Sequence, residues 1–136
     1  MSKIEWKYVT PLKDESILED LEIKMCFPIP SDLIECVKEN NAGMPSCSRF
    51  DLADKKAMVF GGLLSFNEGD EDSFFDYVDM FRDSQTGKLL LLPFGLDPFG
   101  NFFCIKDKKV VFFDHESNAV LPIADTFTQF IKMLHS

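Results

Sequence analysis

The sequence predicts an α+β fold, a single domain in which a mostly antiparallel sheet packs against helices. Strand-like segments cluster between residues 88 and 113 instead of alternating with helices, which argues against a parallel sheet. A compact turn at Asp107-Lys108 separates the last two of these strands and predicts that they pair antiparallel. With 136 residues the chain has the length of one ordinary domain, 1–136, in which 1–13 form an extended N-terminal segment.

Two helices are expected in the first third of the chain. Residues 14–25 carry apolar side chains at helical spacing, and the segment 27–30 ends this helix because proline cannot continue it. Ser31 is a favourable N-cap for the second helix. Residues 40–43, NNAG, offer an Asn or a Gly for the left-handed position that ends it.

The middle of the chain predicts a loop, a strand and an acidic helix. Residues 44–56 are polar and irregular, so we expect a loop. Residues 57–66 are expected to form a strand, in which Gly61-Gly62 indicates a bulge or a close backbone approach. Residues 67–83 are expected to form a helix that Asp72 or Ser73 would cap. Its apolar stripe consists of Phe74, Phe75, Val78 and Phe81.

The rest of the chain predicts three strands and a final helix. The strands are expected at residues 89–94, 102–105 and 110–113, and the last two lack clean alternation, so both of their faces should be covered. The final helix is expected over residues 124–134, with Asp125 as its N-cap. It would bury Phe127, Phe130, Ile131 and Leu134.

Composition and charge narrow the classes of partner. Fifteen Phe and a hydrophobic fraction of 46% indicate a large apolar core, and the alternative use of a surface Phe is to anchor a partner. The net charge of −9 disfavours nucleic acid and anionic membranes, because Lys and Arg drive binding to both. A basic protein partner is compatible with this charge, and so is simple solubility.

The cysteine and histidine pattern predicts neither a metal site nor a cofactor. The four cysteines form no C-x-x-C pair, and the chain has only two histidines. The N-terminus lacks the apolar core of a secretory signal, and the longest apolar run is too short to cross a bilayer. We therefore expect a cytoplasmic protein with reduced thiols.

Residues with catalytic chemistry do not form a recognisable set. Asp114, His115 and Glu116 are consecutive, so neighbouring side chains on a strand would point to opposite faces. The glycine-rich residues 95–101, which include Asp97, lack the spacing of a phosphate-binding loop. We expect a tight turn there, no catalytic residues, and only a secondary partner-binding role for Asp97, Asp114, His115 and Glu116.

The acidic segment 67–83 is the main candidate for partner binding. It holds seven acids against one Arg and so carries −6 of the net charge of −9. It is either a solvated helix face or a docking surface for a basic protein; calcium binding is a third option, but the spacing does not fit the helix–loop–helix template. The candidate residues are Glu68, Asp70, Glu71, Asp72, Asp76, Asp79 and Asp83.

Over about residues 14–135, the order of these motifs resembles the SUKH superfamily, the Smi/Knr-type domain. The first helix with its proline break and the second helix ending in NNAG are similar to the family's first two helices. Residues 94–101, FGLDPFGN, resemble its Gly-x-Asp-x-x-Gly-Asp turn, residues 110–116, VVFFDHE, resemble its Val-Tyr-x-Trp-x-His-Glu strand, and residues 124–131 resemble its final helix. The chain departs from the pattern at Ala42, Asn101 and Asp114.

The resemblance implies a role in protein binding. Bacterial members are typically immunity proteins that bind and neutralise a polymorphic toxin, often a basic nuclease or deaminase, and the family supplies no catalytic residues. A cognate toxin is therefore the expected partner of this chain, as a monomer or weak dimer. The alternatives are a regulatory or scaffold module of the same fold, as in fungal relatives, and a small hydrolase.

Overall fold

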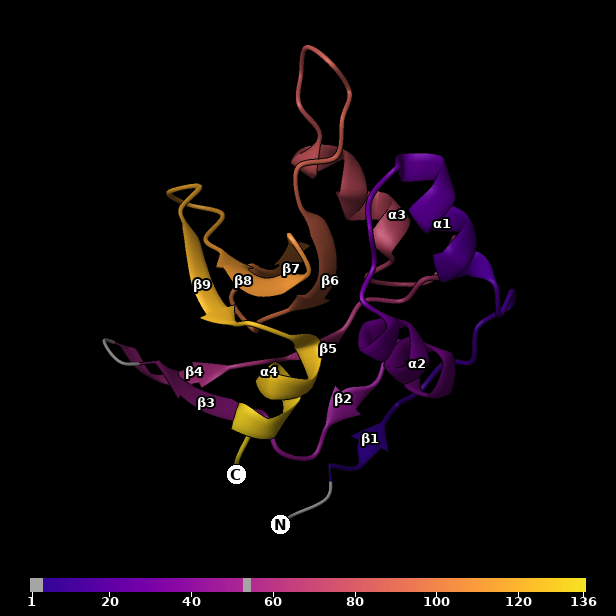
Figure 1. The fold of residues 1–136 in the computed structure, drawn as a ribbon. Helices are drawn as coiled ribbons and strands as arrows, with labels where there is room; N and C mark the ends of the chain where they lie inside the picture. Colours follow the sequence, from indigo (N-terminus) through magenta and orange to yellow (C-terminus); the bar gives the residue numbers. More distant parts are fainter. Residues whose placement is uncertain (1–3, 53–54) are drawn as a thin grey trace.

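The computed structural model describes residues 4–52 and 55–136 and has the expected α+β architecture (Figure 1). The helices are α1 (Ile17–Met25), α2 (Ser31–Asn40), α3 (Phe74–Tyr77), the 3-10 helix η1 (Val78–Phe81) and α4 (Phe127–Met133). The strands are β1 (Trp6–Lys7), β2 (Met44–Pro45), β3 (Arg49–Leu52), β4 (Lys55–Val59), β5 (Gly62–Leu63), β6 (Leu92–Leu96), β7 (Phe102–Lys106), β8 (Lys109–Phe113) and β9 (Val120–Ala124). Among the described residues, no helix has the length and apolarity needed to cross a membrane.

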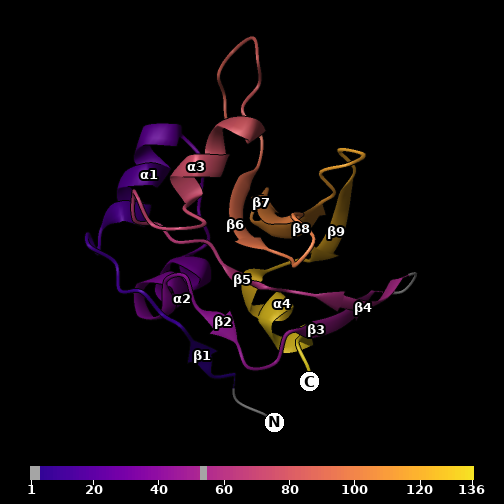
Figure 2. The ribbon, with the colours of Figure 1, turned by 180° about the vertical axis from the view of Figure 1, so that it is seen from behind.

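The main sheet has five strands in the order β5-β6-β7-β8-β9, and all neighbours are antiparallel. Helix α4 lies between this sheet and the β3–β4 hairpin (Figure 1). Seen from behind, β1 and β2 lie beside α2, and α1 and α3 lie above them (Figure 2). The tight turn at Asp107-Lys108 is confirmed, because both residues have positive φ angles, of 51° and 65°, between paired strands.

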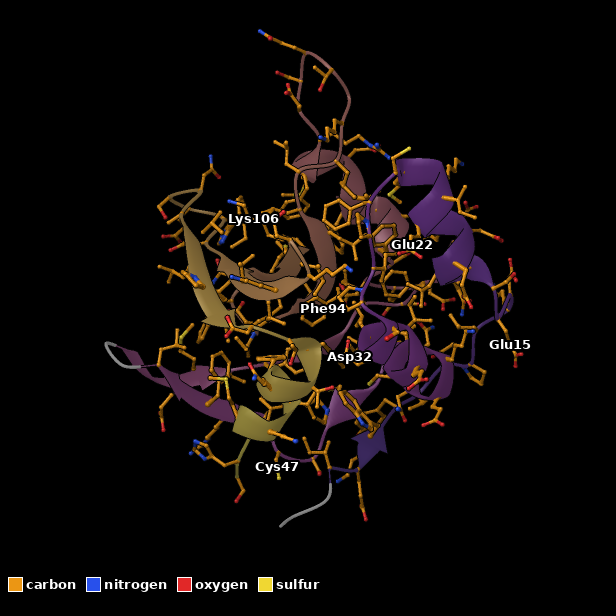
Figure 3. The ribbon with its side chains drawn as sticks, viewed as in Figure 1. Glu15, Glu22, Asp32, Cys47, Phe94 and Lys106 are labelled. Carbon is orange, nitrogen blue, oxygen red and sulfur yellow. The ribbon has the colours of Figure 1, made fainter. Side chains whose placement is uncertain are left out.

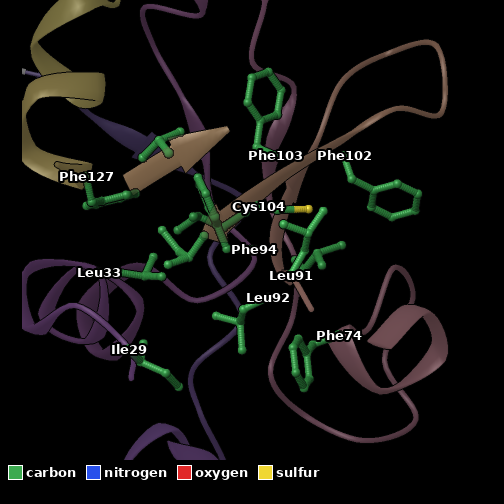
Figure 4. Close-up of a cluster of buried hydrophobic side chains, with 14 of the residues drawn as sticks. Ile29, Leu33, Phe74, Leu91, Leu92, Phe94, Phe102, Phe103, Cys104 and Phe127 are labelled. Atoms are coloured by element: carbon green, nitrogen blue, oxygen red, sulfur yellow. The ribbon is translucent and has the colours of Figure 1, made fainter. Parts of the chain in front are cut away.

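Phenylalanine fills the core, as the composition predicts. The Phe60 ring meets Phe103 at a centroid distance of 5.0 Å and Phe130 at 5.1 Å, both edge to face. Phe50 and Phe94 complete this cluster, which joins α4 to the sheet and the hairpin. Side chains from α2, α3, β6, β7 and α4 gather in one contiguous apolar region (Figure 4). Phe99 is the exception, because 76% of it is exposed.

The predicted loop at residues 44–56 is wrong, because the segment contains β2, β3 and the start of β4. Strand β2 pairs with a strand that is distant in sequence, since Trp6 lies opposite Pro45. The β3–β4 hairpin has a shifted register, so its pattern is irregular in sequence. The predicted strand 57–66 is instead split at Gly61 into β4 and β5. The predicted close approach is confirmed, because a Cβ on Gly61 would lie 2.9 Å from the Leu96 carbonyl oxygen.

The predicted acidic helix over residues 67–83 is also wrong in extent. Residues 67–73 form turns, and only α3 and η1 are helical. The Ser73 hydroxyl accepts a hydrogen bond from the Phe75 N–H at 3.2 Å, so Ser73 is the N-cap and Asp72 is not. Asp72 has a φ of +50°, which cannot continue a helix. The predicted stripe is confirmed, with Phe75 only half-buried.

Several helix ends and strand bounds differ from the predictions. Pro30, not Ser31, occupies the N-cap position of α2, and Ala42, not Asn or Gly, has the left-handed conformation beyond its end. Helix α4 starts later than predicted, because the Thr126 hydroxyl accepts a hydrogen bond from the Gln129 N–H where Asp125 was the expected cap. Strand β6 starts later than residue 89. Strand β9 is not among the predicted strands; it contains Pro122, which an edge strand tolerates because proline lacks an N–H.

The phenylalanine cluster yields a stability prediction. Replacing Phe103, which is fully buried and contacts five other Phe rings, by Ala should lower the unfolding free energy by about 3–5 kcal/mol, because it leaves a cavity. Phe99→Ala is the matched control and should change it by less than about 0.5 kcal/mol. Urea denaturation of both variants measures this difference, and similar losses would contradict the assigned core.

Candidate functional site

A buried asparagine organises the chain around the acidic segment. Asn41, at the end of α2, is fully buried, and its Nδ2 donates to the Thr10 carbonyl oxygen at 2.9 Å and to the Ser65 hydroxyl at 3.2 Å. Its Oδ1 accepts from the Phe66 N–H at 2.8 Å. A single amide thus holds together the N-terminal segment, the end of α2 and the strand that leads into the acidic residues.

The network continues to the acidic turn itself, residues 67–73. Asp70 accepts hydrogen bonds from the Ser65 hydroxyl at 2.7 Å and from Asn67 Nδ2 at 3.0 Å. Asn67 is buried and also pairs with the Pro11 carbonyl oxygen and the Lys13 N–H. Buried Ser73 donates to the Asn67 carbonyl oxygen at 2.8 Å. The turn that carries the first acids is therefore fixed from both ends.

Bonding to Asp70 affects its ionisation. The hydrogen bonds from Ser65 and Asn67, with a smaller contribution from the charge of Lys13, hold the pKa of Asp70 below the ordinary 3.8. Asp70 is therefore ionised at neutral pH, but both of its hydrogen-bond donors are internal. These hydrogen bonds help to fix the turn, and the partner-binding role of Asp70 stays a prediction.

The acidic turn forms a ridge between two grooves. One groove, of about 390 Å³, lies against α1 and mixes acids with Lys13 and Lys24. The other, of about 460 Å³, has three carboxylates and no base among its described lining residues. We call the second one the acidic groove; its lining residues are Tyr8, Ala42, Met44, Gly61, Gly62, Leu63, Ser65, Glu71, Asp72, Leu96, Asp97 and Pro98.

The acidic groove combines charge with exposed apolar surface. Glu71 and Asp72 come from the ridge, and Asp97 comes from the turn after β6, so two separately predicted candidates meet here. Tyr8, which is 77% exposed, and Met44, which is 47% exposed, line the same groove. An aromatic or methionine anchor beside charged groups is a typical arrangement of a protein-binding surface.

The other acids of segment 67–83 have different surroundings. Asp79 forms an ion pair with Arg82 at 2.9 Å, and Asp83 accepts from the Gln85 N–H, which lowers the pKa of Asp83. Asp76 is exposed in α3, and Glu68 lines the groove against α1. The seven predicted acids thus do not form one helix face, and only Glu71 and Asp72 line the acidic groove.

The secondary candidates separate in the same way. The Asp97 carboxylate accepts from the Phe99 and Asn101 backbone N–H groups, each at 2.8 Å, and from Asn101 Nδ2 at 2.9 Å. His115 Nδ1 lies 2.8 Å from Asn101 Oδ1, so Asn101 links the turn to the end of β8. Asp114 accepts from the Glu116 N–H within its own turn. These hydrogen bonds stabilise the turns and connect Asp97 to His115 through Asn101. The secondary partner-binding role of Asp97, Asp114, His115 and Glu116 stays a prediction.

Thiol and metal chemistry have little support among the described residues. No group of three or more His, Cys, Asp or Glu side chains in the described ranges could hold a metal ion. Burial raises the pKa of Cys36 to about 11 and raises that of Cys104 further, so both thiols are protonated at neutral pH. The acidic groove offers a surface that is charged and partly apolar.

The residues that build this site leave no direct signal in the sequence. Asn41 belongs to the predicted helix end, and Ser65 and Asn67 belong to the predicted strand and to the acidic segment. Only their burial, at 0%, 1% and 4% exposure, reveals the network. Tyr8 and Met44 lie far from the acids in sequence, and the pairing of β1 with β2 brings them to the groove.

Comparison with known proteins gives one family. The family model for the SMI1/KNR4 family (SUKH-1) matches residues 11–133. No curated protein and no solved structure matches this chain. The matched range contains the acidic turn and most of both grooves.

The bonding of Asp70 yields a pH prediction. Because its folded pKa is lowered, ionised Asp70 stabilises the protein above the ordinary value of 3.8, and this contribution is lost as the pH falls through the lowered pKa. Asp70→Asn should therefore lower the melting temperature at pH 7, and the gap to the wild type should close toward pH 3. Melting curves across this range test it. A gap that stays constant with pH would show that the charge of Asp70 contributes nothing.

Proposed function

Because this chain belongs to the SMI1/KNR4 family (SUKH-1), we propose that it is a non-catalytic immunity protein that neutralises a basic toxin by binding it at the acidic groove. The partner would be a cognate toxin made by the same or a neighbouring cell, with a nuclease- or deaminase-like domain that acts in the cytoplasm. The observation that carries the proposal is the convergence of Glu71, Asp72 and Asp97 on a groove with no lining base among the described residues.

Electrostatics supports a basic partner. The net charge of −9 attracts a cationic protein from a distance, and the groove directs that attraction to one place. Many toxins that act on nucleic acid carry basic surfaces, because they must bind phosphates. An acidic groove that covers such a surface would block access to the substrate.

Rigidity supports the same proposal. The ridge is held by Asn41, Ser65 and Asn67, so the acidic side chains stand on a fixed backbone before a partner arrives. A surface that is already ordered loses less conformational entropy on binding than a mobile acidic loop. Tyr8 and Met44 add the apolar contact area from which most binding energy comes.

Charge reversal on the ridge tests the electrostatic part. Glu71→Lys with Asp72→Lys should weaken binding to a toxin domain encoded beside this gene by about tenfold or more and slow its association, because both side chains line the acidic groove and opposite charge steers the encounter. The control variant is Glu15→Lys with Glu39→Lys, which changes the net charge by the same amount. Glu15 precedes α1 and Glu39 lies in α2, and both are exposed outside the groove. This control should lose much less.

The measurements are calorimetric affinity at two salt concentrations and rescue of growth when toxin and variant are co-expressed. Equal losses in both double variants would leave only a general effect of net charge and would remove the groove from the mechanism. Full protection by the ridge variant would also contradict it.

Removing the apolar anchors tests the contact itself. Tyr8→Ala with Met44→Ala should accelerate dissociation of the same toxin domain, with an affinity loss of about tenfold to a hundredfold, because anchors act mainly on the off-rate. Ile23→Ala is the control, since Ile23 is 78% exposed on α1 and does not line the groove. Surface plasmon resonance separates the two rates, and an unchanged off-rate in the double variant would exclude this wall as the binding surface.

A further inference from the structure

A third groove, whose charge is opposite to that of the acidic groove, lies between the α1–α2 connection and the β7–β8 hairpin. Its volume is about 480 Å³, and we call it the lysine groove. The residues that matter for its chemistry are Cys26, Phe27, Lys88, Leu90, Lys106 and Lys108. Asp107 is the one acid among its described lining residues.

The lysines stand out against the rest of the molecule. The chain has 23 acids and 14 bases, yet three exposed lysines line this one groove, and exposed Lys109 lies beside them on the same hairpin. Lys106 lies well away from Glu15 of the acidic N-terminal helix region (Figure 3). The protein therefore carries a local positive region on a negative surface.

The hairpin tip that presents these lysines is locally unfavourable. Lys106 and Lys109 are direct cross-strand partners, and like charges in that position repel each other. Lys108 has a φ of +65°, a conformation that favours glycine or asparagine in a two-residue hairpin turn. A turn selected for stability alone would have neither feature. We therefore infer that the lysines at this tip serve a function other than stabilising the fold.

Apolar surface lies beside the charge. Leu90 is 53% exposed, and Phe27 is half-buried in the same groove. A ligand with carboxylates and an apolar side chain would match both features. A nucleic acid matches less well, because the groove has no arginine among its described lining residues and a longer strand would run onto a surface of net charge −9.

We propose that the lysine groove binds an acidic peptide segment of a protein partner, with an apolar side chain of that segment against Leu90. This goes beyond the proposed function, because the acidic groove and the lysine groove have opposite charge and share no lining residue. The failure of either proposal leaves the other unaffected.

The direct test uses a labelled peptide of two leucines separated and flanked by pairs of glutamates. Fluorescence anisotropy should show binding at low salt that weakens as salt rises, and a peptide with glutamine in place of glutamate should bind at least about tenfold more weakly. Lys106→Glu with Lys108→Glu should also reduce affinity by about tenfold or more. Lys7→Glu with Lys132→Glu changes the net charge equally outside the groove and should have little effect.

A second variant separates binding from folding. Lys108→Gly should raise the melting temperature, because glycine suits the positive φ, and should lower peptide affinity, because a charge is removed. A merely structural lysine would give a stability loss instead, and that result would overturn the proposal.

Cysteine labelling locates the bound peptide. Cys26 is exposed in the lysine groove, whereas Cys36 and Cys47 lie outside it. Peptide should slow alkylation of Cys26 alone, as read by mass spectrometry. Absence of peptide binding, equal binding by the Lys106 and Lys108 double variant, or tighter binding of an RNA octamer than of the peptide would each overturn the proposal.

Discussion

The structure depends above all on the buried amide of Asn41. It makes three hydrogen bonds without exposure to water, to the N-terminal segment, to Ser65 and to the Phe66 backbone. Removing that amide would leave buried groups unpaired, each at a cost of about 1–3 kcal/mol. Because these partners come from three parts of the chain, the amide fixes the position of α2 relative to the sheet and of both relative to the acidic turn.

This constraint explains why the acidic turn can be both highly charged and ordered. Its inward side chains, Asn67 and Ser73, are neutral and fully bonded, whereas Glu68 and Glu71 point to solvent. Asp70 lies at the boundary, where internal donors balance its charge. Repulsion among the acids would favour an open loop, and the buried hydrogen bonds oppose that opening. The order of the turn therefore comes from beneath the charged surface.

The parts of the fold that follow from local pattern could be predicted, and the parts that follow from distant pairing could not. The stripe of Phe74 to Phe81 and the turn at Asp107 are visible in short windows of sequence. Strand β3 depends on burial of Phe50 against rings from β7 and α4, which no short window reveals. The acidic segment is predicted as one helix face because its charges are visible in the sequence. The buried hydrogen bonds that fold residues 67–73 into a turn are not visible there.

The acidic groove and the lysine groove have opposite charges and could bind each other in two copies of the protein, but the net charge opposes this self-association. A molecule with an acidic groove on one part of its surface and a lysine groove on another could join to copies of itself head to tail, and such contacts build open chains. Each copy carries a charge of −9, so the copies repel each other over about 8–10 Å at physiological salt before the grooves can meet. The basic partner that we propose would meet attraction at the same range and would reach the acidic groove without this barrier. An acidic segment would reach the lysine groove only if it were short, or if its own protein were already bound. If both proposals hold, the excess of acids would therefore favour an order in which a cationic protein docks first and the lysine groove holds a local acidic segment afterwards.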